Sequence, residues 1–166
     1  MKNVIFTLSI IILFLGCEKP LKEQHIPVHI GLIEYDAKKD TLGFEVCHED
    51  LLSPYFHHLN ISYEGEKPAM VKEYKNRFKP SDSLENGFIT IRFIVNCKGK
   101  AGRFRVIQID EHYNLKTFSD ETVMQLYHIT RSLKGWDIFE RNHESYDYIR
   151  YVTFKIHNGE IKDIMP

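Results

Sequence analysis

Large apolar residues occupy every second position from Ile89 to Val95, near the middle of the chain. A period of two predicts a β-strand with one buried face. Phe88 and Ile94 fall on the other face, so we expect that face to be covered in part as well. After a Lys-Gly turn, residues 103–110 are expected to return as an antiparallel strand.

Residues 147–156 show a similar alternation and predict a second long strand. The pair Asn158-Gly159 follows, which is a strong signal for a two-residue hairpin turn. We therefore expect the final residues, 160–164, to pair with the long strand. This pairing would cover a sheet edge that could otherwise recruit another strand.

Two segments have apolar residues at helical spacing. In residues 67–78, Pro68 occupies a favourable first-turn position, and apolar residues form a stripe along one side. Residues 119–134 begin with Ser119 as N-cap, followed by two acids, and Gly135 is expected to end this helix. Residues on the predicted buried sides are Met70, Val71, Tyr74, Phe78, Val123, Leu126, Tyr127, Thr130 and Leu133.

The N-terminal third is predicted to be an extension of the main domain. Residues 26–35 and 41–47 are rich in β-branched and aromatic residues, and the charged stretch 36–40 separates them. This pattern predicts a β-hairpin within residues 25–62. The chain is thus expected to be α+β, with an antiparallel sheet, two helices on one face and this hairpin in front.

The first residues have the layout of a secretory signal, with Lys2 before an apolar run that ends at Gly16-Cys17. The run is about a dozen residues long, whereas a bilayer-spanning helix needs about 20. Its end resembles the lipobox of bacterial lipoproteins, with Phe14 where leucine is usual. The resemblance implies cleavage after residue 16 and lipid on Cys17. The alternative is an ordinary cleaved signal in which Cys17 has no role.

Cleavage before Cys17 would leave about 150 residues, enough for one domain with a core. Residues 17–24 are expected to form a polar tether between the lipid and the domain. The whole chain has a formal net charge of −1. This near-neutral balance gives no electrostatic reason to expect binding to nucleic acid or to an anionic membrane surface.

Two further cysteines, Cys47 and Cys97, each follow a predicted strand. In an exported chain such a pair is normally oxidised, so we expect a disulfide that ties the N-terminal strands to the main sheet. The alternative is a reactive thiol at Cys47 beside His48. Neighbours on a strand point to opposite faces, which disfavours a Cys-His dyad.

The chain contains nine histidines, and the densest group is His48, His57 and His58. The sequence after His48-Glu49 lacks the second histidine of a metalloprotease motif. We therefore expect hydrogen-bonded or surface histidines, with no metal and no other cofactor. The chain also shows no nucleophile elbow, no phosphate-binding glycine loop and no acid pair, so it is not expected to be an enzyme.

Four basic residues gather around the central turn: Lys98, Lys100, Arg103 and Arg105. Lysine and glycine commonly make turns soluble, and this is the simpler interpretation. The other interpretation is a site for a phosphate or an anionic glycan.

From residue 63 onward the chain resembles the C-terminal domain of TonB-type energy transducers. The similar stretches are Tyr63-Glu-Gly-Glu-Lys-Pro-Ala69, Gly87-Phe-Ile-Thr-Ile-Arg-Phe-Ile-Val-Asn-Cys-Lys-Gly99 and Trp136 after the second helix. The resemblance implies that residues 63–166 form this fold. The short tether differs from the long proline-rich segment of a transducer. Small outer-membrane lipoproteins of the Bacteroidota are more similar in this respect.

The sequence thus predicts a lipoprotein that is anchored to the outer membrane and faces the periplasm. The leading hypothesis is a non-catalytic binding or scaffold module that contacts an envelope protein. One alternative is an accessory to TonB-dependent uptake. Another is a glycan-binding or metal-binding protein, or an enzyme, that uses the histidine-rich segment 48–58.

Overall fold

The structure is a computed structural model that describes residues 31–40, 43–52 and 63–165. The predicted signal peptide, the lipidation site Cys17, the tether and the histidines His57 and His58 lie outside these residues. Residues 31–40 and 43–52 are called the N-terminal segment below.

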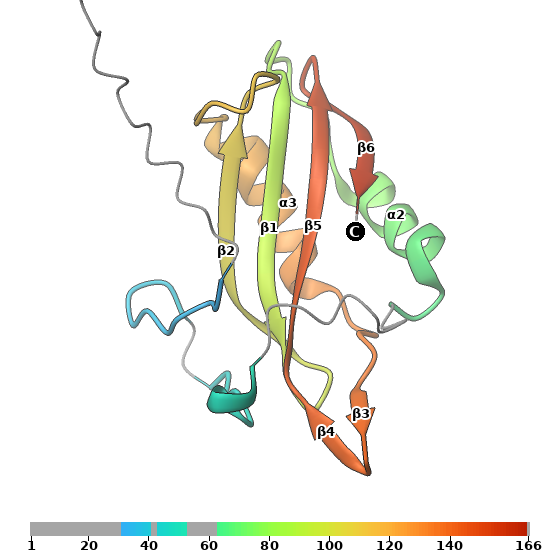
Figure 1. Cartoon of the computed structure of the whole chain (residues 1–166). Coiled ribbons are helices and arrows are strands. Elements are labelled where there is room, and N and C mark those ends of the chain that lie inside the picture. The colour runs from blue at the N-terminus through green and yellow to red at the C-terminus, as the bar shows by residue number, and fades with distance from the viewer. Residues whose placement is uncertain (1–30, 41–42, 53–62, 166) are drawn as a thin grey trace, which may run out of the picture.

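The main sheet has four antiparallel strands in the order β2-β1-β5-β6 (Figure 1). They are β1 (Gly87–Val95), β2 (Ala101–Ile109), β5 (Tyr148–His157) and β6 (Glu160–Met165). The two central strands pair along their whole length, from Gly87 opposite Ile156 to Val95 opposite Tyr148. The antiparallel sheet, the central turn and the C-terminal hairpin predicted from the sequence are confirmed.

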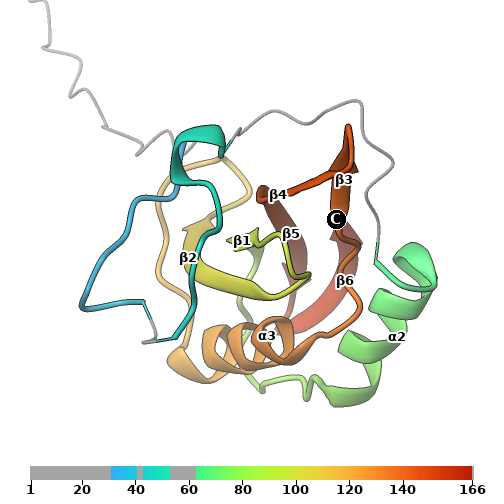
Figure 2. The same cartoon turned by 90° about the horizontal axis from the view of Figure 1, so that it is seen from below.

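Helices α2 (Glu66–Arg77) and α3 (Asp120–Ser132) lie on the same face of this sheet (Figure 2). The hydroxyl groups of Tyr74 and Thr130 lie 2.9 Å apart in a buried hydrogen bond that joins the two helices. Burying each large apolar side chain contributes about 1.5–3 kcal/mol. The fully buried side chains under the helices include Met70, Ile89, Ile91, Phe93, Val95, Leu126, Val152, Phe154 and Ile156.

Helix α3 begins as the sequence predicts. The Ser119 hydroxyl accepts a hydrogen bond from the Thr122 amide. The Glu85 carboxylate accepts further bonds from the Ser119 amide and hydroxyl, at 2.6 and 3.0 Å. Burial alone would raise the pKa of Glu85, but hydrogen bonds from Ser83 and Ser119 outweigh it, so the pKa is lowered. A carboxylate at this position also suits the positive end of the helix dipole.

The predicted N-terminal hairpin is not confirmed, because residues 31–40 and 43–52 contain no strand. The charged turn does form, since the amides of Lys39 and Asp40 donate to the Asp36 carbonyl. Outside the turn, the carbonyl oxygens of Ile33 and Glu34 accept hydrogen bonds from arginine side chains of β2 and not from a partner strand. The second half of the segment contains a short 3-10 helix, η1 (Glu49–Leu51).

The N-terminal segment covers part of the sheet face opposite the helices. Ile33 and Leu52 pack there against Ile94 in a second, smaller apolar cluster. Phe44, Val46 and Ile149 border this cluster. The expectation that the Ile94 face is partly covered is therefore confirmed.

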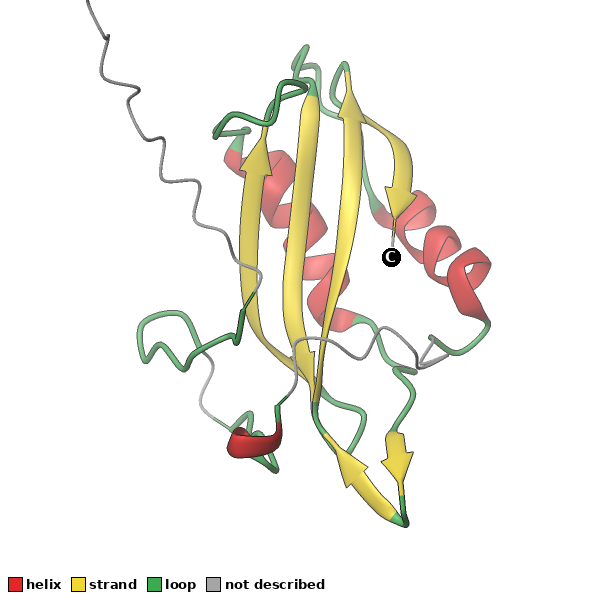
Figure 3. Ribbon diagram, viewed as in Figure 1, coloured by secondary structure: helices red, strands yellow, loops and turns green. Residues whose placement is uncertain are grey.

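A second hairpin was not predicted from the sequence (Figure 3). It consists of β3 (Phe139–Arg141) and β4 (Glu144–Tyr146), which form a separate two-stranded sheet. Its turn residues, Asn142 and His143, both have positive φ, at 53° and 65°. Such turns commonly carry Asn-Gly, and histidine in the second position concealed the signal.

Within the residues that the structure describes, no helix combines the length and the apolar character needed to cross a membrane.

Candidate functional site

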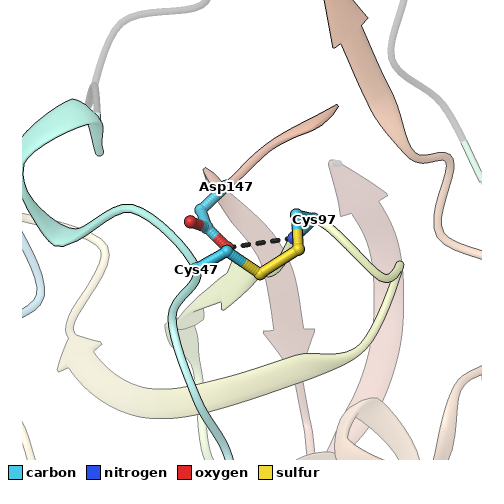
Figure 4. A group of neighbouring side chains, drawn as sticks. All are labelled: Cys47, Cys97 and Asp147. Carbon is cyan, nitrogen blue, oxygen red and sulfur yellow. Dashed lines mark hydrogen bonds between the residues drawn. A yellow bond between two sulfur atoms is a disulfide. The ribbon is translucent and has the colours of Figure 1, made fainter. Parts of the chain in front are cut away.

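A disulfide between Cys47 and Cys97 joins the N-terminal segment to the turn that follows β1 (Figure 4). Cys97 lies just beyond the end of β1, and Cys47 lies 50 positions earlier in the chain. Their Cα atoms are 6.1 Å apart, within the normal range for a disulfide. The pairing is the one that the sequence predicts, although Cys47 ends a loop and not a strand.

Asp147, a residue that is only 1% exposed, reinforces this corner with its carboxylate. One oxygen accepts the Cys97 amide at 2.9 Å, and the other accepts the His48 amide at 2.7 Å. The carboxylate therefore holds the backbone beside both cysteines. Cys47, Cys97 and Asp147 lie close enough to share a metal ion. In the disulfide form, however, the two sulfur atoms are bonded to each other and only the carboxylate remains as a ligand.

Arg103 occupies an irregular point in β2, where the register with β1 shifts. Its φ of 50° is unfavourable for a residue with a side chain. The side chain is 7% exposed, and its guanidinium group pairs with the Glu49 carboxylate and donates to the Ile33 carbonyl. Its Nε is buried with no hydrogen-bond partner among the described residues. Strained backbone and unsatisfied buried donors are features that functional sites often retain.

Arg105 makes the second ionic contact between β2 and the N-terminal segment. Its two terminal nitrogens donate to the Asp40 carboxylate at 2.6 and 2.9 Å. This paired hydrogen bonding to Arg105 lowers the pKa of Asp40, although burial opposes the effect. The Asp40 side chain is only 3% exposed, so solvent screens the pair weakly.

These contacts enclose a cavity of about 220 Å³ between the N-terminal segment, the start of β2 and α3. In the described part of the chain, four cationic residues and one acidic residue line it. The cavity also has aromatic walls, and the rings of Phe104 and Tyr127 meet edge to face at 5.7 Å. The charged lining residues are Lys39, Asp40, Lys100, Arg103 and Arg131.

A shallower groove of about 430 Å³ lies against α3 near the end of α2. Met124 is 45% exposed beside it. The lining residues are Arg77, Glu121, Met124, Gln125, His128 and Ile129.

The outer side of β5 is only partly covered. β5 pairs with β1 from Tyr148 to Ile156, but β6 pairs only with Thr153–His157. No other strand of the described chain pairs with residues 148–152 on that side. Tyr151, within this stretch, is 51% exposed. The sequence predicted that the C-terminal strand covers this edge, and among the described residues it pairs with Thr153–His157 alone, while no strand pairs with residues 148–152 on that side.

The basic cluster predicted around the central turn divides into parts with different contacts. Arg103 and Arg105 hold the N-terminal segment. Of the four basic residues of the cluster, Lys100 and Arg103 line the cavity. Sequence reasoning missed Lys39, Tyr127 and Arg131 as neighbours of this cluster, because they come from distant segments. It also missed Asp147, which resembles any acid at the start of a strand.

The ring of His48 lies 6.1 Å from that of Tyr146, centroid to centroid. His48 therefore faces the β3–β4 hairpin, while its backbone amide donates to Asp147.

The chain matches no family model, no curated protein and no solved structure.

Proposed function

We propose that this protein is a non-catalytic, lipid-anchored module that binds another protein of the bacterial envelope. In this proposal, lipid on Cys17 holds the domain at the periplasmic face of the outer membrane. The C-terminal part acts as a TonB C-terminal-like domain, as its sequence resemblance implies.

The Cys47–Cys97 disulfide supports export, because structural disulfides persist mainly in oxidising compartments. It also suits an anchored protein. The N-terminal segment follows the predicted tether, and the disulfide and two arginine–carboxylate pairs fasten this segment to the sheet. Force or motion at the lipid would therefore reach the sheet through several contacts.

The observation that carries the binding role is the half of the β5 edge, residues 148–152, with which no second described strand pairs. A strand edge offers regularly spaced amides and carbonyls, which an extended peptide can pair with. Residues 148–152 provide such a stretch, and β6 prevents the same pairing further along. A partner with an extended segment of about five residues would fit this length.

A pull-down from solubilised envelope membranes tests the proposal. The full-length lipidated protein should retain a specific envelope protein, and an excess of the unlipidated domain should compete for it. If only proteins of lipoprotein processing are retained, the binding role is wrong.

The identity of the captured protein separates the leading role from the uptake alternative. Outer-membrane transporters would favour an accessory to TonB-dependent uptake, whereas other envelope proteins would favour a scaffold. A transporter-derived peptide should then bind at residues 148–152 and not along Thr153–His157, where β6 already pairs.

A further inference from the structure

We infer that the cavity between the N-terminal segment, β2 and α3 binds an anionic sugar residue, meaning a single saccharide ring that carries a carboxylate or phosphate group. This inference does not depend on the proposed protein-binding role, which uses a different part of the sheet.

The charge of the cavity favours an anion. Among the described lining residues, four side chains are cationic and one, Asp40, is a carboxylate. Asp40 is already engaged by both terminal nitrogens of Arg105, which lies just outside the lining. Of the described neighbours just outside the lining, Asp36 pairs with Lys39 and Glu49 pairs with Arg103. A concave surface with excess positive charge concentrates anions.

The remaining walls favour a ring over a bare ion. Phe44, Phe104 and Tyr127 all line the cavity and present apolar surface beside the cations. Phe44 packs directly onto the backbone at Gly102, where a Cβ atom would overlap its ring. Ligand sites typically combine apolar and aromatic walls with a few polar groups that set orientation. The volume of about 220 Å³ is smaller than a drug-sized pocket and suits a single sugar.

The walls are held in place before any ligand arrives. The Arg103–Glu49 and Arg105–Asp40 pairs fix the N-terminal segment against β2. The buried Asn96 side chain organises the central turn by accepting the Lys98 and Lys100 amides, and it donates to the Glu45 carbonyl. Lys100 is thus presented from an ordered turn. A site organised in advance loses less entropy on binding.

Arg103 gives an independent reason to regard this cavity as a site. It combines a positive φ, a buried guanidinium and an unsatisfied Nε among the described residues. Each feature is unfavourable for folding. The Glu49 carboxylate already pairs with this guanidinium, so the strained residue holds the cavity wall in place beside the ligand.

The test uses the mature protein and four probes: glucuronate, glucose 6-phosphate, glucose and inorganic phosphate. Binding is followed by amide chemical shifts in a titration. Ligands of about a dozen heavy atoms are expected to bind in the millimolar range. Both anionic sugars should shift amides of the cavity lining, and they should bind at least about tenfold more tightly than glucose or inorganic phosphate.

Lys100→Gln should weaken binding of both anionic sugars by about tenfold, because it removes one charged contact. Lys98→Gln is the matched control, since Lys98 belongs to the same turn but does not line the cavity. It should change affinity by less than about twofold. Thermal unfolding of both variants verifies that they fold.

Several results would overturn the inference. If glucose bound as tightly as the anionic sugars, their charge would not contribute to binding. If inorganic phosphate bound as tightly as the anionic sugars, the sugar ring would not contribute. If Lys100→Gln and Lys98→Gln lowered the affinity for the anionic sugars equally, the sugars would be attracted to the basic turn in general and not bound in the cavity. Absence of cavity shifts at millimolar probe would show that the cavity binds no anionic sugar.

Discussion

Arg105 and Asp40 show how much of the N-terminal attachment rests on single side chains. Their paired hydrogen bonds join segments 65 positions apart and take the place of the strand ladder that the sequence pattern suggested. The folded-state pKa of Asp40 is lowered from 3.8 by this pairing, despite the opposing effect of burial. The pair therefore links the stability of the fold to pH.

Asp40→Asn should lower the free energy of unfolding at neutral pH by about 2 kcal/mol, because Arg105 loses a charged partner. Since the folded pKa lies below the unfolded value, the wild-type contribution is complete above 3.8 and is lost as pH falls through the folded pKa. Urea unfolding of both proteins at neutral and acidic pH should show their stabilities converging in acid. Asp82→Asn, at an exposed position, is the control and should have little effect. A constant difference down to the lowest pH would contradict the account.

A second prediction at the scale of single residues concerns the disulfide. Cys97→Ser should lower the free energy of unfolding by about 2–4 kcal/mol, because the 50-residue loop is no longer closed in the unfolded chain. Chemical denaturation measures the loss, and reduction of the wild-type protein should reproduce it. Non-reducing mass spectrometry of protein from the periplasm should find the Cys47–Cys97 peptide. Two freely alkylated thiols in that sample would refute the pairing.

At the scale of elements, the β5–β6 hairpin is fixed by its turn. The Gly159 amide donates to the Glu85 carbonyl at 3.1 Å, so the turn packs onto the loop before β1. A Cβ atom at Gly159 would overlap the carbonyl oxygens of Ser81 and Ser83. Gly159 also has a φ of 74°, which favours glycine.

Gly159→Ala should destabilise the protein by about 2–4 kcal/mol, since backbone strain and overlap add. Gly43→Ala is a matched control: φ is again positive, at 94°, but no heavy atom of the described residues lies within 4 Å of the added Cβ. It should cost only about 1–2 kcal/mol. Thermal or urea unfolding distinguishes the two. Equal losses would mean that the turn does not pack on residues 81–85 in solution.

Elements with strong local patterns were predictable from the sequence, and those that depend on distant partners were not. The strand at Phe88 and the helix capped by Ser119 follow from alternation and capping. The N-terminal segment has a strand-like composition, but arginine side chains of β2 donate hydrogen bonds to its carbonyl oxygens. No local sequence pattern reveals these distant donors. The sequence predicted only part of the cavity lining. Lys100 and Arg103 lie close together in the sequence, whereas Lys39 and Arg131 come near them only in the folded chain.

For the whole molecule, we propose a disulfide-linked domain on a short tether that carries lipid at Cys17. Cys17→Ala should abolish incorporation of labelled fatty acid and release the protein from outer-membrane fractions. The fold should be unaffected, because residues 31–165 contain the disulfide and the core. Metabolic labelling with membrane fractionation measures both effects. A variant that still carries lipid in the outer membrane would refute anchoring through Cys17.

We propose above all that a partner protein contacts residues 148–152 of β5, where the described chain provides no pairing strand on the outer side. Site-specific photo-crosslinking in intact cells tests it most directly, with a photoreactive phenylalanine analogue replacing Tyr151. Tyr113 receives the same analogue as control, because it is also an exposed tyrosine, at 66% exposure, but lies outside the strands. We expect a discrete adduct with one envelope protein from position 151 and none from position 113. No adduct from position 151, or the same adduct from both positions, would contradict it.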